Sequence, residues 1–164
     1  MISAKGTPWE GVDGMSEELL RELMAPAENA VVDAANYFVG EIKATLKTGE
    51  RTGRAYKVSK TGPLHIASAP GEPPAVLYGA LGNSIGHTDP KWVDGVAVEC
   101  EVGTGLGVAA KDNATAEGYA ERLEYGGTDS RGVYIAPRPY MEPTALRVQG
   151  PIEEMFAVAI GGAP

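Results

Sequence analysis

The sequence predicts an α+β fold in which an antiparallel β-sheet packs against a long N-terminal helix and a C-terminal helix, with long extended loops. Apolar residues recur at helical spacing between Pro26 and Lys47, and residues 96–102 alternate with a period of two. Glycine (22 residues) and proline (12 residues) are abundant, which indicates well-defined loops. Short strands with local connections favour antiparallel pairing with the helices on one face of the sheet.

The 164 residues suit a single domain that buries a core without disulfides or metals. Residues 1–15 are expected to form a flexible N-terminal arm, and residues 16–164 the α+β domain. Ser16 is expected to cap a short helix. Because proline suits a helix start better than a helix interior, a second, longer helix is expected from Pro26 to Lys47. Its apolar stripe consists of Ala27, Val31, Ala34, Ala35, Phe38, Ile42 and Leu46.

The clearest strand is predicted where Val96, Val98, Cys100 and Val102 alternate with Ala97, Glu99 and Glu101. Glu99 and Glu101 are therefore expected to face solvent, or the lumen of a channel. Further strands are expected near residues 55–58, 84–87 and 133–135, and short helices near residues 79–81 and 119–123. A final helix is expected to start near Pro143 and to break or kink at Gly150-Pro151.

A proline-rich loop is predicted at about residues 61–78, around the run His65-Ile66-Ala67-Ser68-Ala69-Pro70-Gly71-Glu72-Pro73-Pro74-Ala75. Its prolines exclude a helix or a central strand, so an extended, polyproline-like excursion is expected. About 13 extended residues at roughly 3.1 Å each would reach some 40 Å, enough to bridge neighbouring chains. Deleting Ala69 to Pro74 is then expected to leave the domain folded.

The formal net charge of −8 argues against a protein that grips nucleic acid through its phosphates. An acidic surface suits a channel through which DNA slides without specific binding. The single cysteine, Cys100, excludes an internal disulfide and fits folding in the cytoplasm. No apolar stretch approaches the roughly 20 residues of a membrane span, and no secretory signal peptide is expected.

No set of residues predicts catalysis, a metal or a cofactor. His65, His87 and Cys100 are scattered and match no compact metal-ligand motif. Glu117, Glu121 and Glu124 are interpreted as a solvated helix face, with a carboxylate-based hydrolase as a remote alternative. Residues 103–107 lack the Gly-Lys-Ser/Thr ending of a phosphate-binding loop, and no nucleophile elbow is present. The chain is therefore expected not to be an enzyme.

Two segments resemble a known family. The first contains Arg51-Thr52-Gly53-Arg54-Ala55-Tyr56, the proline-rich run and Gly79-Ala80-Leu81-Gly82-Asn83-Ser84-Ile85. The second contains Tyr119-Ala120-Glu121-Arg122-Leu123-Glu124-Tyr125-Gly126 and Ala136-Pro137-Arg138-Pro139-Tyr140-Met141-Glu142-Pro143-Thr144-Ala145-Leu146. Together they resemble the tail-completion, or head–tail joining (neck), proteins of long-tailed bacteriophages, the family of minor tail protein Z of phage lambda. The resemblance covers roughly residues 51–146, in the family's order.

This resemblance implies a structural virion protein, made in the host cytoplasm, that forms a ring (sixfold in the family) around the DNA channel. The ring would lie at the head-proximal end of the tail. Its partners would be copies of itself, head-closure or connector proteins, and tail tube or tail terminator proteins. The implied assembly loop comprises His65, Ser68, Pro70, Gly71, Glu72, Pro73, Pro74 and Tyr78. The second motif comprises Tyr119, Glu124, Tyr125, Arg138, Pro139 and Tyr140.

Two neighbouring positions in the same particle remain as alternatives. Tail terminators and head-closure (stopper) proteins are also small α+β ring subunits, so the resemblance leaves all three roles open. The remote third alternative is the virion-associated hydrolase that would use the Glu117, Glu121 and Glu124 carboxylates.

Overall fold

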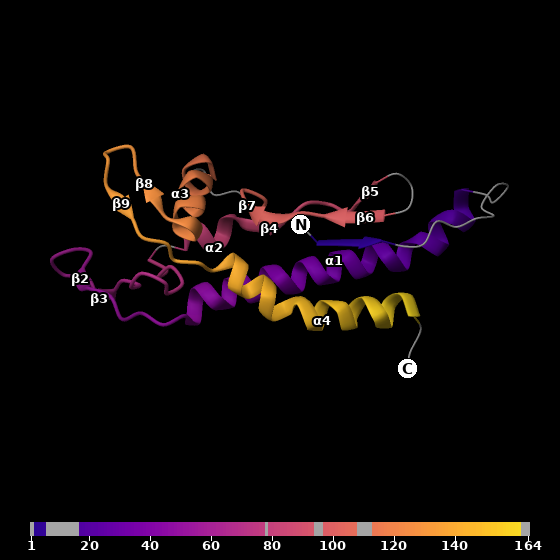
Figure 1. The fold of residues 1–164 in the computed structure, drawn as a ribbon, viewed down its shortest axis with the longest axis horizontal. Helices are drawn as coiled ribbons and strands as arrows, with labels where there is room; N and C mark the ends of the chain where they lie inside the picture. Colours follow the sequence, from indigo (N-terminus) through magenta and orange to yellow (C-terminus); the bar gives the residue numbers. More distant parts are fainter. Residues whose placement is uncertain (1, 6–16, 78, 94–96, 108–112, 162–164) are drawn as a thin grey trace.

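A computed structural model describes residues 2–5, 17–77, 79–93, 97–107 and 113–161 (Figure 1). Two helices dominate it, α1 (Glu17–Thr48) and α4 (Met141–Gly161). The predicted α+β class is confirmed, with small antiparallel sheets, a long N-terminal helix and a C-terminal helix. The remaining elements are β1 (Ile2–Lys5), β2 (Ala55–Lys57), β3 (Leu64–Ile66), α2 (Ala80–Ser84), β4 (Ile85–His87), β5 (Lys91–Val93), β6 (Ala97–Cys100), β7 (Val102–Thr104), α3 (Asn113–Tyr125), β8 (Gly127–Thr128) and β9 (Tyr134–Ile135).

The molecule is elongated, and its layers follow the long axis of α1. With 32 residues, α1 is about 48 Å long at 1.5 Å per residue. In Figure 1, α1 lies between the strands on one side and α4 on the other. The main sheet has the antiparallel order β1-β6-β5, and β4 pairs with β7 beside it.

The core forms on two sides of α1. Val31 and Ala35 pack against Val98 and Cys100 of β6. The other side of the stripe packs against residues of α3, α4 and β4, and the cluster comprises Ala34, Phe38, Ile42, Leu46, Ile85, Leu123, Tyr140, Val148 and Ile152. The predicted stripe is therefore buried, except that Ala27 is half-buried. Each fully buried aliphatic side chain contributes roughly 1.5–3 kcal/mol, so this stripe is the main attachment of α1.

The expectation that Pro26 starts a new helix is wrong, because α1 runs through it from Glu17 to Thr48. Pro151 likewise lies inside the continuous helix α4. Both prolines are exposed. A proline removes one helical hydrogen bond and displaces a carbonyl group one turn earlier, and on the solvent side water can satisfy that carbonyl.

The N-terminal arm also differs from the expectation. Residues 2–5 form β1, which pairs antiparallel with β6 from Ile2 opposite Cys100 to Lys5 opposite Ala97. Residues 6–16 of the predicted arm lie outside the described residues. The strand adds a backbone partner to β6, so β6 is the central strand of its sheet.

The proline-rich loop is folded onto the body rather than extended. Ala69 to Glu72 form a turn in which the Glu72 N–H donates to the Ala69 carbonyl group over 3.1 Å, and Gly71 has a φ of 85°. Proline followed by a glycine of positive φ is typical of a type II turn. Ser68 and Pro74 are buried. The chain therefore reverses here, and this loop does not reach 40 Å from the domain.

Candidate interaction site

Two β-hairpins and the proline-rich loop form one end of the molecule, at the left of Figure 1. The β2–β3 hairpin pairs Ala55 with Ile66 and Lys57 with Leu64, and the β8–β9 hairpin pairs Gly127 with Ile135. We call residues 49–77 and 125–139 together the hairpin end. Such short isolated hairpins have little stability of their own in water. Contacts between the loops must therefore hold this end in shape.

Glu72 closes the proline-rich loop onto the start of the β2–β3 hairpin. Its Oε2 accepts hydrogen bonds from the Thr52 N–H over 3.0 Å and from the Ala69 N–H over 2.7 Å. Its Oε1 accepts a hydrogen bond from the Thr52 hydroxyl group. These bonds, with that from the Thr52 hydroxyl largest, lower the pKa of the Glu72 carboxyl group below its ordinary value. The loop thus depends on an ionised Glu72.

Arg138 joins the proline-rich loop to the second motif. Its guanidinium Nε and Nη2 each lie 3.4 Å from the Ser68 carbonyl oxygen, 70 residues earlier, and Nη1 donates to the Ala136 carbonyl group over 3.0 Å. Beside it, the Gly71 N–H donates to the Pro137 carbonyl group over 2.9 Å. The two segments that carry the family resemblance are therefore bonded directly to each other.

Glu124 fixes the second motif to α4. Its carboxylate is 7% exposed and accepts hydrogen bonds from the N–H groups of Tyr140 (2.9 Å), Met141 (3.0 Å) and Glu142 (2.9 Å). It thereby satisfies free donors at the start of α4 and places a negative charge at the positive end of the helix dipole. The Tyr140 side chain is buried, and this burial, followed by the nearby Glu124 charge, raises the pKa of its hydroxyl group.

Asp129 orders the loop of the β8–β9 hairpin. Its Oδ1 accepts 2.9 Å hydrogen bonds from the N–H groups of Arg131 and Val133, and its Oδ2 pairs with the Arg131 guanidinium group at 2.8 Å. The backbone bond from Val133, then the side-chain bond from Arg131, lowers the pKa of Asp129. Asp129 was not predicted as a site residue, although Asp-Ser-Arg-Gly has the composition of a turn.

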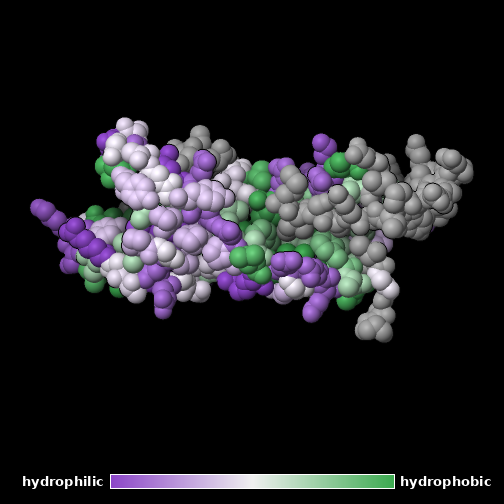
Figure 2. Space-filling model, in the orientation of Figure 1, coloured by the Kyte–Doolittle hydropathy of each residue, from purple (hydrophilic) through white to green (hydrophobic). Residues whose placement is uncertain are grey.

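The hairpin end exposes apolar side chains. Of thirteen large apolar residues that are exposed in the described parts of the chain, eight lie here: Tyr56, Val58, Leu64, Ile66, Leu77, Tyr125, Val133 and Tyr134. Tyr125 is 74% exposed and Leu64 is 62% exposed. Figure 2 shows hydrophobic residues beside hydrophilic ones at this end. Single exposed apolar residues are normal on a protein surface, whereas several at one end indicate an interaction site.

The charge of the hairpin end is opposite to that of the rest of the chain. It contains six basic and three acidic residues, a net charge of +3. The remaining residues contain eight basic and nineteen acidic ones, a net charge of −11. The basic residues of the hairpin end are Arg51, Arg54, Lys57, Lys60, Arg131 and Arg138. The overall charge of −8 therefore conceals a strongly polarised molecule.

The residues of the two implied motifs divide by burial. Ser68, Pro74, Glu124 and Tyr140 are buried inside the chain, where they stabilise its fold. Exposed and half-buried members remain for contact with a partner: His65, Pro70, Gly71, Glu72, Pro73, Tyr119, Tyr125, Arg138 and Pro139. The His65 ring packs edge-on against Tyr56, with ring centroids 5.3 Å apart. Tyr78 lies outside the described residues.

The alternation of β6 places Val98 and Cys100 against α1. Glu99 is half-buried, opposite Ser3 of β1 and Lys91 of β5, and Glu101 is exposed. Ala97, expected on the outer face with these acids, is also buried, and Val96 lies outside the described residues.

Two of the three candidate metal ligands lie together. The Cys100 Sγ is 3.5 Å from His87 Nδ1 and donates to the Thr88 carbonyl group over 3.0 Å, whereas His65 lies in the distant β2–β3 hairpin. Cys100 is 1% exposed, and burial raises the pKa of its thiol group. Within the described residues, no three metal-binding side chains form a group.

The carboxylates of α3 have separate environments. The expected solvated face is wrong for Glu124, whose carboxylate is buried and bonded to the start of α4, whereas Glu121 is exposed as expected. Both line an open depression of about 470 Å³ between α3 and α4, together with Glu142. The Glu117 side chain lies outside the described part of the chain. A carboxylate already bound to three backbone N–H groups is poorly suited to acid–base catalysis.

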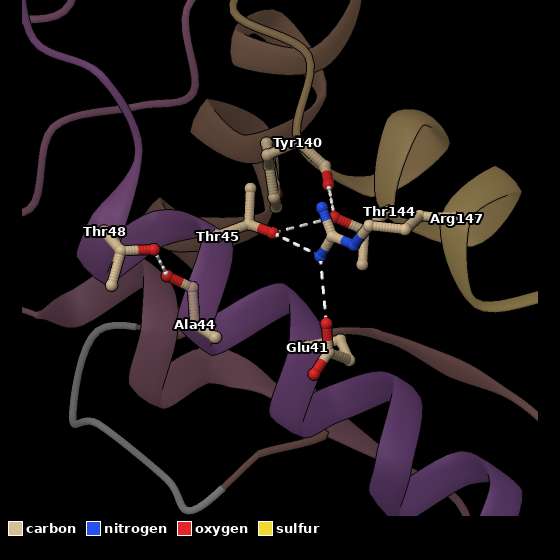
Figure 3. Close-up of polar contacts among 7 residues, drawn as sticks. All are labelled: Glu41, Ala44, Thr45, Thr48, Tyr140, Thr144 and Arg147. Atoms are coloured by element: carbon tan, nitrogen blue, oxygen red, sulfur yellow. Dashed lines mark hydrogen bonds and ion pairs between the residues drawn. The ribbon is translucent and has the colours of Figure 1, made fainter. Parts of the chain in front are cut away.

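A polar network between α1 and α4 was not predicted from the sequence. The Arg147 Nη2 donates to Glu41 (3.1 Å) and to the Thr45 hydroxyl group (2.9 Å), which lies 3.1 Å from the Thr144 hydroxyl group (Figure 3). Thr144 is fully buried and donates to the Tyr140 carbonyl group over 2.7 Å. The network fixes α4, and with it the Glu124 contacts, against α1.

Comparisons with family models, with curated proteins and with solved structures found no match to this chain. Among the helices of the described residues, none combines the length and apolarity that a membrane crossing requires.

Proposed function

We propose that this chain is a structural subunit of a tailed bacteriophage, of the tail-completion or head–tail joining type. In this role it forms a ring around the DNA channel at the head-proximal end of the tail. It contacts head-closure or connector proteins on one side and tail tube or tail terminator proteins on the other.

One observation supports this proposal above the others. The two segments that resemble the neck family, far apart in sequence, are bonded through Arg138 with Ser68 and through Gly71 with Pro137. They form the end of the molecule where most of the exposed large apolar side chains gather. Such a surface is suited to contact with another protein, because removing apolar side chains from water lowers the free energy.

The charge distribution also agrees with a structural role. Exposed acids on the body, such as Glu101, give a surface that repels DNA and lets it pass without specific binding. Glu124 serves the fold, which leaves the hydrolase alternative without one of its carboxylates.

The proposal is tested by removing the chain from the phage that encodes it. A stop codon early in its gene is expected to give filled heads beside unjoined tails of normal length. Expression of the chain from a plasmid should restore joined particles, and mass spectrometry of purified wild-type particles should detect the chain. Overlong tails would instead assign a terminator role, and heads that lose DNA a stopper role. Absence of the chain from particles would contradict a virion role.

A further inference from the structure

We propose that copies of this chain associate head to tail, with the β2–β3 hairpin of one copy seated on the outer face of α4 in the next copy. The inference rests on the proposed function, since it names the contact that would build the ring.

The first surface is basic and apolar. One face of the β2–β3 hairpin exposes Leu64 and Ile66, with Lys57 directly opposite Leu64, and Lys60 follows in the connecting loop. Apolar groups of this kind contribute nothing to phosphate binding, and the −11 charge on the rest of the chain repels DNA at a distance. An acidic protein surface that also exposes apolar side chains is the better partner.

The second surface is acidic and apolar. Outside the hairpin end, the most exposed large apolar side chains of the described residues are Leu146 (70%) and Val158 (62%), both on α4. Glu153 and Glu154 lie between them in sequence and are exposed. At helical spacing these four share one face with the small residues Gly150 and Ala157, which allow a neighbouring backbone to approach closely. Arg147 lies on the same face, but its guanidinium group is paired with Glu41 of α1. Figure 2 shows hydrophobic and hydrophilic residues together over α4.

Pairing of like surfaces is disfavoured by their charge. Two hairpin ends of +3 repel, and so do two α4 faces that carry Glu153 and Glu154. Within one chain the two surfaces lie apart, with the hairpin at one end of Figure 1 and the C-terminal half of α4 toward the other. The complementary pairing therefore joins different copies through different surfaces. A contact of this heterologous type produces a ring when its rotation closes.

The test uses two charge-reversed full-length variants and native mass spectrometry at low salt, over a range of protein concentration. Lys57→Glu/Lys60→Glu makes the hairpin acidic, and Glu153→Lys/Glu154→Lys makes the α4 face basic. Each alone is expected to weaken self-association by roughly tenfold or more, because attractive pairs become repulsive. In a mixture of the two, every contact again joins opposite charges, so assemblies with equal numbers of each variant are expected.

Matched controls separate a specific contact from overall charge. Lys43→Glu/Lys47→Glu and Asp33→Lys/Glu121→Lys make the same changes in net charge at exposed residues elsewhere, and are expected to retain self-association. All the substituted side chains are exposed, so each variant is expected to fold. Far-ultraviolet circular dichroism and melting curves check this.

Three results would overturn the inference. The first is a wild-type chain that stays monomeric at its highest soluble concentration, and the second is a mixture that fails to reassemble. The third is a hairpin variant that keeps self-association but loses salt-sensitive binding to duplex DNA, which would assign the basic end to nucleic acid. If the chain assembles head to tail but is absent from particles, the proposed function alone is refuted. If the chain is present in particles but the mixed variants fail to reassemble, this contact alone is refuted.

Discussion

The buried carboxylate of Glu124, near the end of α3, accepts a hydrogen bond of 2.9 Å from the backbone N–H of Tyr140, next to the start of α4. The same carboxylate accepts hydrogen bonds from Met141 and Glu142. Since Arg138 then reaches back to Ser68, a chain of polar contacts runs from α4 to the proline-rich loop. The hairpin end is therefore positioned by the helices, although its own strands are short.

Replacing Glu124 with alanine is expected to lower the free energy of unfolding by about 2–3 kcal/mol, because buried N–H groups lose their acceptor and α4 loses its cap. Glutamine should cost less, since its amide oxygen can still accept one or two of the bonds. Glu121→Gln on the same helix is the control, and its exposed side chain should change stability by less than about 0.5 kcal/mol. Urea unfolding measures all three variants, and equal effects at both positions would contradict the capping role.

Thr144→Val is expected to destabilise the α1–α4 contact by about 1–2 kcal/mol. Valine keeps the shape of threonine but removes the buried hydroxyl group that contacts Thr45 and the Tyr140 carbonyl group (Figure 3). Thr48→Val is the matched control, because the Thr48 hydroxyl group is exposed and bonds only to its own helix at Ala44. Thermal unfolding should separate the two variants, and an equal loss in both would show that the network contributes nothing between the helices.

Gly86→Ala is expected to cost roughly 3 kcal/mol or more, because a Cβ at this position in β4 would overlap the Leu106 carbonyl group. Gly40→Ala in α1 is the opposite case. Nothing lies within 4 Å of a Cβ there, so alanine should raise stability by about 0.5–1 kcal/mol through its higher helix propensity. Denaturant midpoints test both changes, and a neutral Gly86→Ala variant would contradict the close approach of Leu106 to β4.

The proline-rich loop is expected to loosen in acid because the pKa of Glu72 is lowered by its bonds to Thr52 and Ala69. A lowered pKa in the folded state means that the stabilisation is complete above the ordinary carboxyl pKa of about 4.3. It is lost as pH falls through the lower, folded value. Amide hydrogen exchange at Thr52 and Ala69 should therefore accelerate in acid relative to amides in α1. Glu72→Gln should remove most of this pH dependence, whereas Glu50→Gln should preserve it, and identical profiles in both variants would refute the role of Glu72.

Much of the architecture could be predicted from the periodic spacing of apolar residues in the sequence. The spacing of Val31, Phe38, Ile42 and Leu46 predicted the buried stripe of α1, and the alternation around Val98 predicted β6. Pro26 misled because proline costs about 3 kcal/mol inside a helix, and the sequence did not show that burial of the α1 stripe in the core offsets this cost. β1 was missed because a four-residue strand is defined by its partner, which is more than 90 residues away in sequence.

The interaction site was predicted only in part. The motif residues were found by resemblance, but their burial could not be predicted. Glu124 was expected on a solvated helix face, and the buried Tyr140 was not distinguished from the exposed Tyr125. Pro70-Gly71 is a dipeptide typical of turns. Because further prolines follow it, the segment was instead predicted to be extended. The polarised charge depends on which loops meet in space, and it therefore emerges only once the β2–β3 and β8–β9 hairpins are seen at the same end of the molecule (Figure 1).

The most direct test of the account is a cryo-electron microscopy map of the intact particle at the head-proximal end of the tail. The account predicts a ring of this chain in which Leu64 and Ile66 of each β2–β3 hairpin are covered by the α4 face of the next copy. A ring in which these hairpins point into solvent and contact no other chain would contradict it.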